Sequence, residues 1–138
     1  MPYTIANAVG CQFNHVGCKR PTRRELDKVR RGHFAKLTFI EGTADECMWV
    51  IVASRDGFGR CTGYLDSRPN DIESVSAGDA VDFTVDNICR LYNAAYIRDV
   101  VTTTCHGIVS RLKTWVEYAR NGRAAASRLE RYERASRS

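Results

Sequence analysis

Apolar and polar positions alternate every second residue over much of the first two thirds of the chain, which is the period of a half-buried β-strand. The predicted strands are His33 to Ile40, Cys47 to Ser54, Arg60 to Leu65 and Ala80 to Val85, with Ile88 to Tyr92 continuing or pairing beside the last. The second strand is apolar at every position from Met48 to Val52, which is typical of a central strand covered on both faces.

Turn residues separate these segments. Asp56-Gly57-Phe58-Gly59 predicts a hairpin between the second and third strands, and Pro69 ends the pairing of the third because it has no amide hydrogen. Asp71 to Val75 is expected to form one helical turn, and Ala77-Gly78-Asp79 turns the chain into the fourth strand. Together these segments predict a small curved sheet.

Helical patterns flank the strands. Thr22 and Glu25 predict a reciprocally capped start of a short basic helix, which Gly32 ends. In the last third, apolar residues return at helical spacing, with a change of phase at Gly122 that indicates two helical segments. The expected fold is α+β: a small antiparallel β-barrel or curved sheet with an N-terminal short helix and C-terminal helices. One domain, 1–138, would hold a core at about 31–93 and a helical extension at about 103–135.

Composition excludes several classes of protein. The 138 residues contain no apolar run of membrane-spanning length, and the first residues lack the basic segment of a secretory signal. We therefore expect no membrane association and a cytoplasmic location in a bacterial or phage-infected cell. An apolar content of 43% fits a packed globular domain.

Charge is unevenly distributed along the chain. Residues 19–36 carry eight basic and two acidic side chains, residues 41–86 three basic and ten acidic, and the remainder ten basic and four acidic. An acidic centre would repel phosphates on the same face. The pattern therefore fits solvated faces, a bipolar monomer, or a homo-oligomer formed through opposite charges.

Cysteine and histidine chemistry gives no clear site. We expect the six cysteines to be mostly buried free thiols, because the apolar pattern supplies a core without disulfides. Cys11, His15 and Cys18 have the chemistry of zinc ligands, but their spacing matches no known zinc motif and no fourth ligand is near in sequence. No cofactor and no catalytic residue are predicted.

Four segments in order resemble the YegJ-like family of uncharacterised bacterial domains. They are Gly32 to Phe39, Glu46 to Val50, Gly63 to Pro69 and Gly78 to Phe83, and the resemblance covers roughly Arg31 to Tyr92. Ser67 stands where that family usually has asparagine. The resemblance implies a small β-barrel-like domain and carries no activity or functional residues.

Two sets of residues are candidates for binding. The first is basic and would contact an acidic protein or nucleic acid: Arg23, Arg24, Arg30 and Arg31 beside the first helix, and Arg120, Arg123, Arg131 and Arg134 near the end. The second is aromatic, Trp49, Tyr64 and Tyr92, which we expect to be core residues, with ligand stacking as the alternative. The leading hypothesis is a non-enzymatic protein-binding accessory protein of immunity, inhibitor or regulatory type with an acidic protein partner. A nucleic-acid-binding accessory protein is the alternative, and an enzyme of unknown type is third.

Overall fold

A computed structural model describes residues 2–8, 20–92 and 126–137, and every structural statement below concerns these residues. In chain order they form β1 (Thr4–Ile5), α1 (Arg23–Leu26), β2 (Phe34–Glu41), β3 (Ala44–Arg55), β4 (Arg60–Leu65), β5 (Ala80–Thr84), the single 3₁₀ turn η1 (Val85–Asn87) and β6 (Arg90–Tyr92). A helix at 126–137, called the C-terminal helix, follows. All five predicted strands are present, with ends shifted by a few residues.

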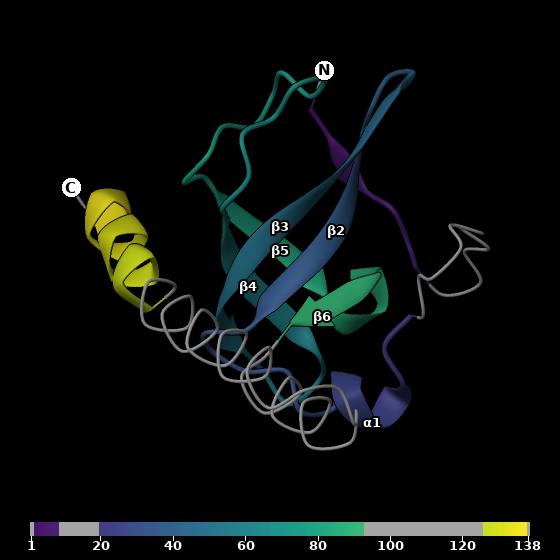
Figure 1. Ribbon diagram of the computed structural model, residues 1–138, viewed down its shortest axis with the longest axis vertical. Helices are drawn as coiled ribbons and strands as arrows, with labels where there is room; N and C mark the ends of the chain where they lie inside the picture. Colours follow the sequence, from purple (N-terminus) through teal and green to yellow (C-terminus); the bar gives the residue numbers. More distant parts are fainter. Residues whose placement is uncertain (1, 9–19, 93–125, 138) are drawn as a thin grey trace, which may run out of the picture.

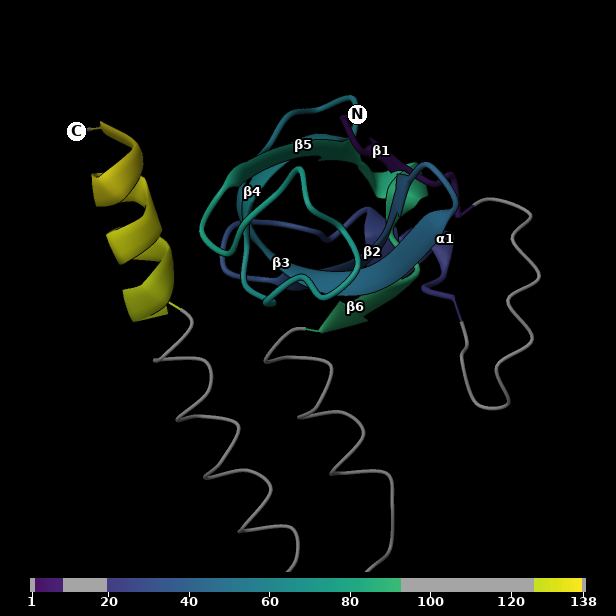
Figure 2. The same cartoon turned by 90° about the horizontal axis from the view of Figure 1, so that it is seen from above.

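The strands form one antiparallel sheet in the order β1-β2-β3-β4-β5, which curls into a half-barrel (Figures 1 and 2). The last strand departs from expectation. β6 pairs with β2, matching Lys36 with Arg90, and does not lie beside β5. The turn η1 redirects the chain before β6 begins, and the Cys89 amide then donates to the Lys36 carbonyl oxygen at 3.0 Å.

The inner face of the half-barrel holds the main core. Alternate residues of the strands point inward, as the sequence pattern predicts, and are buried. They include Leu37, Phe39, Met48, Val50, Val52, Leu65, Val81 and Phe83. Leu26 and Val29 cover one end of this core from the α1 segment.

Gly63 shows how closely the strands approach. A Cβ atom at this position would lie 2.5 Å from both the carbonyl oxygen of Ile51 and the Cγ1 of Val50. β3 and β4 are paired here, with a register irregularity between Val52 and Ser54. Glycine therefore permits a backbone approach that any larger residue would prevent.

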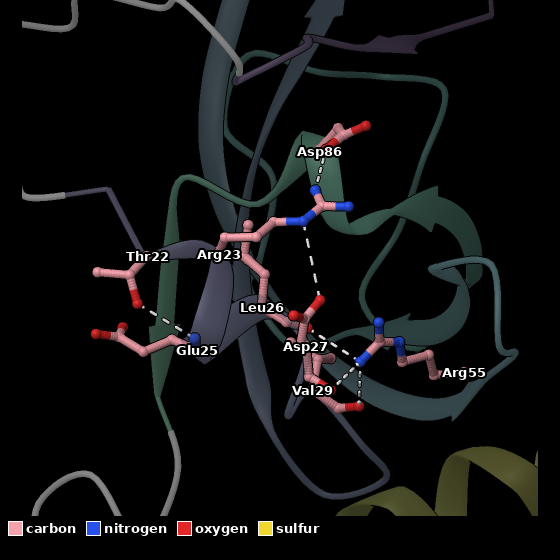
Figure 3. A network of polar contacts seen from close by, with 8 residues as sticks. All are labelled: Thr22, Arg23, Glu25, Leu26, Asp27, Val29, Arg55 and Asp86. Carbon is pink, nitrogen blue, oxygen red and sulfur yellow. Dashed lines mark hydrogen bonds and ion pairs between the residues drawn. The ribbon is translucent and has the colours of Figure 1, made fainter.

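The predicted N-terminal helix is reduced to the single turn α1. Thr22 accepts a hydrogen bond from the Glu25 amide at 3.2 Å, but Asp27 already ends the helix. The helix does not extend to Gly32, because carbonyl groups at its end accept hydrogen bonds from a side chain of β3. The Arg55 guanidinium donates to the carbonyl oxygens of Leu26, Asp27 and Val29 at 3.0, 2.7 and 3.3 Å (Figure 3).

The helical turn predicted at Asp71 to Val75 is absent. This segment is an irregular loop whose amides are bound by two carboxylates from the β2–β3 hairpin. Glu46 accepts from the amides of Asn70 and Asp71, and Glu41 accepts from that of Ser74. Because the carboxylates satisfy these donors, the loop needs no helical hydrogen bonds of its own.

The C-terminal helix packs against the outer face of the sheet (Figure 1). Leu129 is 2% exposed and forms a second cluster with Ile51 and Tyr64. Tyr132 stacks on Tyr64 with ring centroids 5.9 Å apart, and its hydroxyl donates to Asp66 at 2.8 Å. Among the described residues no helix has the length and apolar character needed to cross a bilayer.

Candidate interaction site

The arginines predicted to bind a partner beside α1 are exposed, and two of the four lie beside carboxylates. Arg23 is 3.9 Å from Asp27 and 3.5 Å from Asp86 (Figure 3). Arg31 pairs with Glu133 of the C-terminal helix, and this pair raises the pKa of Arg31 and lowers the pKa of Glu133. Arg24 and Arg30 are exposed in the same region.

The arginines of the C-terminal helix show the same arrangement. Arg134 lies 3.8 Å from Glu130, and Arg128 lies 3.3 Å from Asp66, while Arg131 is exposed. Arg120 and Arg123 lie outside the described residues. The predicted basic stripe is therefore interspersed with acidic groups, and such a surface attracts phosphate less than an uninterrupted row of arginines would.

Four carboxylates of the acidic centre accept hydrogen bonds from backbone amides: Glu41, Glu46, Asp56 and Asp79. Hydrogen bonds from the amides of Asp71, Asn70 and Ile72 lower the pKa of Glu46, and the Ser74 hydroxyl lowers the pKa of Glu41. These groups brace the loop 66–79. Within the ranges that the structure describes, no three His, Cys, Asp or Glu side chains are placed to hold a metal ion.

The aromatic candidates differ in their surroundings. Trp49 lies on the outer face and is half-buried, with the Lys36 ammonium 5.7 Å from its ring, so our expectation that it is a core residue is wrong. The cause is strand alternation, because its neighbours Met48 and Val50 take the inner face. Tyr64 is buried against the C-terminal helix, as expected of a core residue, and the side chain of Tyr92 lies outside the described residues.

Ser67 has a role of its own at this face. Its hydroxyl accepts a hydrogen bond from the Trp49 amide at 3.0 Å. Ser67 therefore caps a backbone amide with its side chain, although it stands where the YegJ-like family usually has asparagine. The Trp49 carbonyl oxygen accepts from the Asp66 amide at 2.9 Å. A small groove of about 270 Å³ lies here between Phe34, Trp49, Asp66 and Ser67.

The most exposed large apolar side chain of the described residues is Phe58, at the tip of the β3–β4 hairpin. It is 87% exposed, whereas Ile40, the next large apolar side chain, is 36% exposed. The Arg60 guanidinium lies 5.7 Å from the Phe58 ring centroid. A large aromatic group in this position is solvated in the free protein and available to a partner.

The turn that carries Phe58 is firmly held. Asp56 accepts hydrogen bonds from the amides of Phe58 and Arg60 at 2.8 and 3.0 Å, and its second oxygen accepts from Arg60 Nε at 2.9 Å. These bonds lower the pKa of Asp56, with the Arg60 amide as the largest cause. Gly59 has a φ of 84° and bonds the Val85 amide through its carbonyl oxygen, which ties the turn to η1. The exposed ring therefore stands on an ordered support.

An open groove of about 990 Å³ begins beside this turn. Its walls come from β1, from the facing ends of β3 and β4, and from β5. Both acidic and basic side chains line it. Its lining includes Tyr3, Ile5, Asp82 and Phe83, together with Arg55, Asp56 and Arg60. The turn and this groove form one continuous surface, which we call the β1–β5 site.

Two of the three described thiols, Cys61 and Cys89, are not activated nucleophiles, because burial raises the pKa of each. Cys47, Cys61 and Cys89 are all free, as expected, but Cys47 is exposed and Cys89 is half-buried, so only Cys61 of these three is buried as predicted. Burial also lowers the pKa of His33, which keeps this imidazole neutral at physiological pH. Cys11, His15 and Cys18 lie outside the described residues, so the zinc hypothesis stays untested.

The comparisons identify a family. A family model described as "Uncharacterized protein conserved in bacteria (DUF2314)" matches residues 14–113. The chain belongs to this family. The match is longer than the segment on which the sequence resemblance rests, and it supports an uncharacterised bacterial family without supporting the YegJ-like name. Neither the curated proteins nor the solved structures contain a match to the chain.

Sequence reasoning missed the exposed phenylalanine. Gly57 and Gly59 correctly predict a tight hairpin, and Phe58 between them has no apolar partner two residues away on either side. An aromatic residue at the centre of a polar turn is the signal that was available.

Proposed function

We propose that this protein is a non-enzymatic protein-binding accessory protein of bacterial or phage origin, of immunity, inhibitor or regulatory type. The observation that carries the proposal is Phe58, 87% exposed on a turn whose backbone is fixed by Asp56. Exposed aromatic residues on ordered supports are frequent anchors of protein interfaces, because little conformational entropy is lost when they bind.

Arg60 adds a second element to this anchor. Its guanidinium is held beside the ring by Asp56, and its side chain is 72% exposed. Tyr, Trp and Arg dominate the energetically important positions of protein interfaces, and Phe is also enriched there. An aromatic ring paired with a fixed arginine thus favours a protein surface over a small polar ligand.

Nucleic-acid binding is less favoured by the charges around the basic groups. Arg23, Arg31 and Arg134 each lie beside a carboxylate. A phosphate approaching any of them would meet negative charge as well as positive charge.

Site-specific cross-linking tests the proposal. A photoreactive phenylalanine analogue replaces Phe58 in one variant and Thr43, which is exposed in the β2–β3 turn, in a control variant. We expect irradiated bacterial cells to give a discrete protein adduct from position 58 that position 43 does not give. Phe58→Ala should abolish co-purification of that protein and leave the melting temperature within about 2 °C of wild type.

Two results would contradict the proposal. One is the absence of any adduct specific to position 58. The other is an adduct that nuclease removes and protease does not, which would point to nucleic acid instead.

A further inference from the structure

We propose that the β1–β5 site binds an extended segment of the partner protein as an added β-strand, with a basic side chain opposite Asp82. The inference deepens the proposed function and rests on it for the identity of the partner as a protein. Four observations on the described residues carry it: the edge of β5 that no described strand covers, the part of the β1 edge at Tyr3 and Ile5 that no described strand covers, the relative direction of these strands, and the charge of Asp82 beside the groove.

The hydrogen-bonding pattern of β5 shows which backbone groups are unpaired. The Val85 amide donates to Gly59 and the Leu65 amide donates to Asp79, so residues 79 and 85 direct their backbone groups toward β4. Hydrogen-bonded positions alternate in an antiparallel pair. The backbone groups of Ala80 and Asp82 therefore point away from β4, along the free edge.

The same reasoning applies to β1. The Ala6 amide donates to the Thr38 carbonyl oxygen at 2.9 Å, and Thr4 pairs with Ile40. The amides of residues 4 and 6 thus face β2, and the backbone groups of Tyr3 and Ile5 face the opposite side. Just beyond β1 the two segments already meet, because the Ala8 amide donates to the Asp86 carbonyl oxygen at 2.8 Å and the Asn87 side-chain amide donates to the Ala6 carbonyl oxygen at 3.2 Å. β1 and β5 lie next to each other in the curled sheet and line the same groove (Figure 2).

The strand directions specify how a segment would enter. Every neighbouring pair from β1 to β5 is antiparallel, so β1 and β5 run in the same direction. A strand placed between them and running the other way pairs with both in the antiparallel geometry of the whole sheet. Its backbone would pair with β5 at Ala80 and Asp82 and with β1 at Tyr3 and Ile5, up to the end where Ala8 already bonds Asp86.

Side-chain chemistry selects the occupant. Alternate residues of the added strand would point inward toward Ile5 and Phe83, which favours apolar side chains there. The residues between them would lie on the outer face beside Asp82, which is exposed and accepts a hydrogen bond from Thr62 at 3.0 Å. Burial and the nearby charges of Asp79 and Asp82 raise the pKa of Tyr3, so these two carboxylates act on the part of the groove beside Tyr3, although Arg55 and Arg60 also line the groove.

The charge also argues against a second copy of the chain as occupant. Two β5 edges pairing antiparallel about their midpoint would bring one Asp82 opposite the other. Like charges directly opposite in a sheet are destabilising. A lysine or arginine opposite Asp82 gives the favourable pair, so the expected segment alternates apolar and polar residues around a basic one.

Amide exchange of the full chain, measured by nuclear magnetic resonance, tests the strand addition. In the free protein we expect the Ala80 and Asp82 amides to exchange quickly and the Val81 and Phe83 amides to exchange slowly. The probe is a blocked synthetic peptide of alternating valine and threonine with a central lysine. Its binding should slow exchange at Asp82 and Ile5 at least tenfold, and a peptide N-methylated along one edge should not.

Charge variants supply the control. Asp82→Asn keeps a side-chain acceptor for Thr62 and should weaken binding of the lysine peptide about two- to fivefold, the range of one cross-strand charge pair. Asp82→Lys should reverse the preference toward a peptide with a central glutamate. Both variants should melt near the wild-type temperature, since position 82 is exposed.

The outcomes separate this inference from the proposed function. Slow exchange at Asp82 before any peptide is added, or peptide binding that leaves Asp82 unprotected, would overturn the strand addition. If position 58 still cross-links to a protein in that case, the proposed function stands. Dimerisation of the free chain with protection of Asp82 would show that a second copy is the occupant, which also overturns the inference.

Discussion

Truncation of Leu129 to alanine should release the C-terminal helix without unfolding the sheet. Leu129 is 2% exposed and is the buried residue by which the described helix contacts Ile51 and Tyr64. Leucine-to-alanine changes at buried sites cost about 2–5 kcal/mol. We expect about 2–3 kcal/mol here, because a docked helix can shift to fill part of the space and its exposed ion pairs add little.

This loss corresponds to a roughly 30- to 150-fold change in the ratio of docked to released helix. Trypsin reports on that ratio, because cleavage after Arg131 requires the helix to open locally. Mass spectrometry should show cleavage at this bond faster by a similar factor. The melting temperature of the sheet should change little, since the inner core is a separate cluster that does not include Leu129.

Ser127→Ala is the matched control, because Ser127 is exposed on the same helix. Trypsin should cleave this variant after Arg131 at the wild-type rate. Unchanged cleavage of Leu129→Ala would refute the docking reasoning. Cooperative loss of the whole sheet with the full 2–3 kcal/mol would refute the separation of the two clusters.

Four further predictions concern stability and charge. Gly63→Ala should destabilise the sheet by about 3 kcal/mol in denaturant titration, since its Cβ would lie 2.5 Å from backbone; a neutral result would contradict the close approach. Trp49→Ala should cost about 1–2 kcal/mol in the same assay, less than a core tryptophan, because the ring is half-buried; a loss of 4 kcal/mol would restore the core interpretation. Glu46 has a lowered pKa in the folded state, so its stabilisation is present above the pKa of an unfolded glutamate and is lost as pH falls through the folded value. The melting temperature of Glu46→Gln should therefore decrease less steeply than that of the wild type as the pH is lowered below about 4. An equal decrease in both proteins would contradict this. Arg131→Glu with Arg134→Glu should leave the melting temperature nearly unchanged and lower the salt needed to elute the protein from heparin, and an unchanged elution would mean that these arginines bind no polyanion.

Local patterns in the sequence determined the strands. Alternation from Phe34 to Ile40 defines an inner and an outer face, and Gly57 with Gly59 defines the hairpin, because both depend on neighbouring residues alone. The capping residue Thr22 was likewise readable, since a cap is bonded within one helical turn.

Contacts between distant segments decided the rest. Arg55 binds the carbonyl groups at the end of α1, and Glu46 binds the amides of the loop where a helical turn was predicted at residues 71–75. β6 pairs with β2. In each case the two interacting segments are more than twenty residues apart in sequence. The exposure of Phe58 and the half-burial of Trp49 also depend on which face other elements cover. Period and propensity report the local backbone, whereas burial and hydrogen-bond partners are fixed only when the curled sheet brings remote residues together.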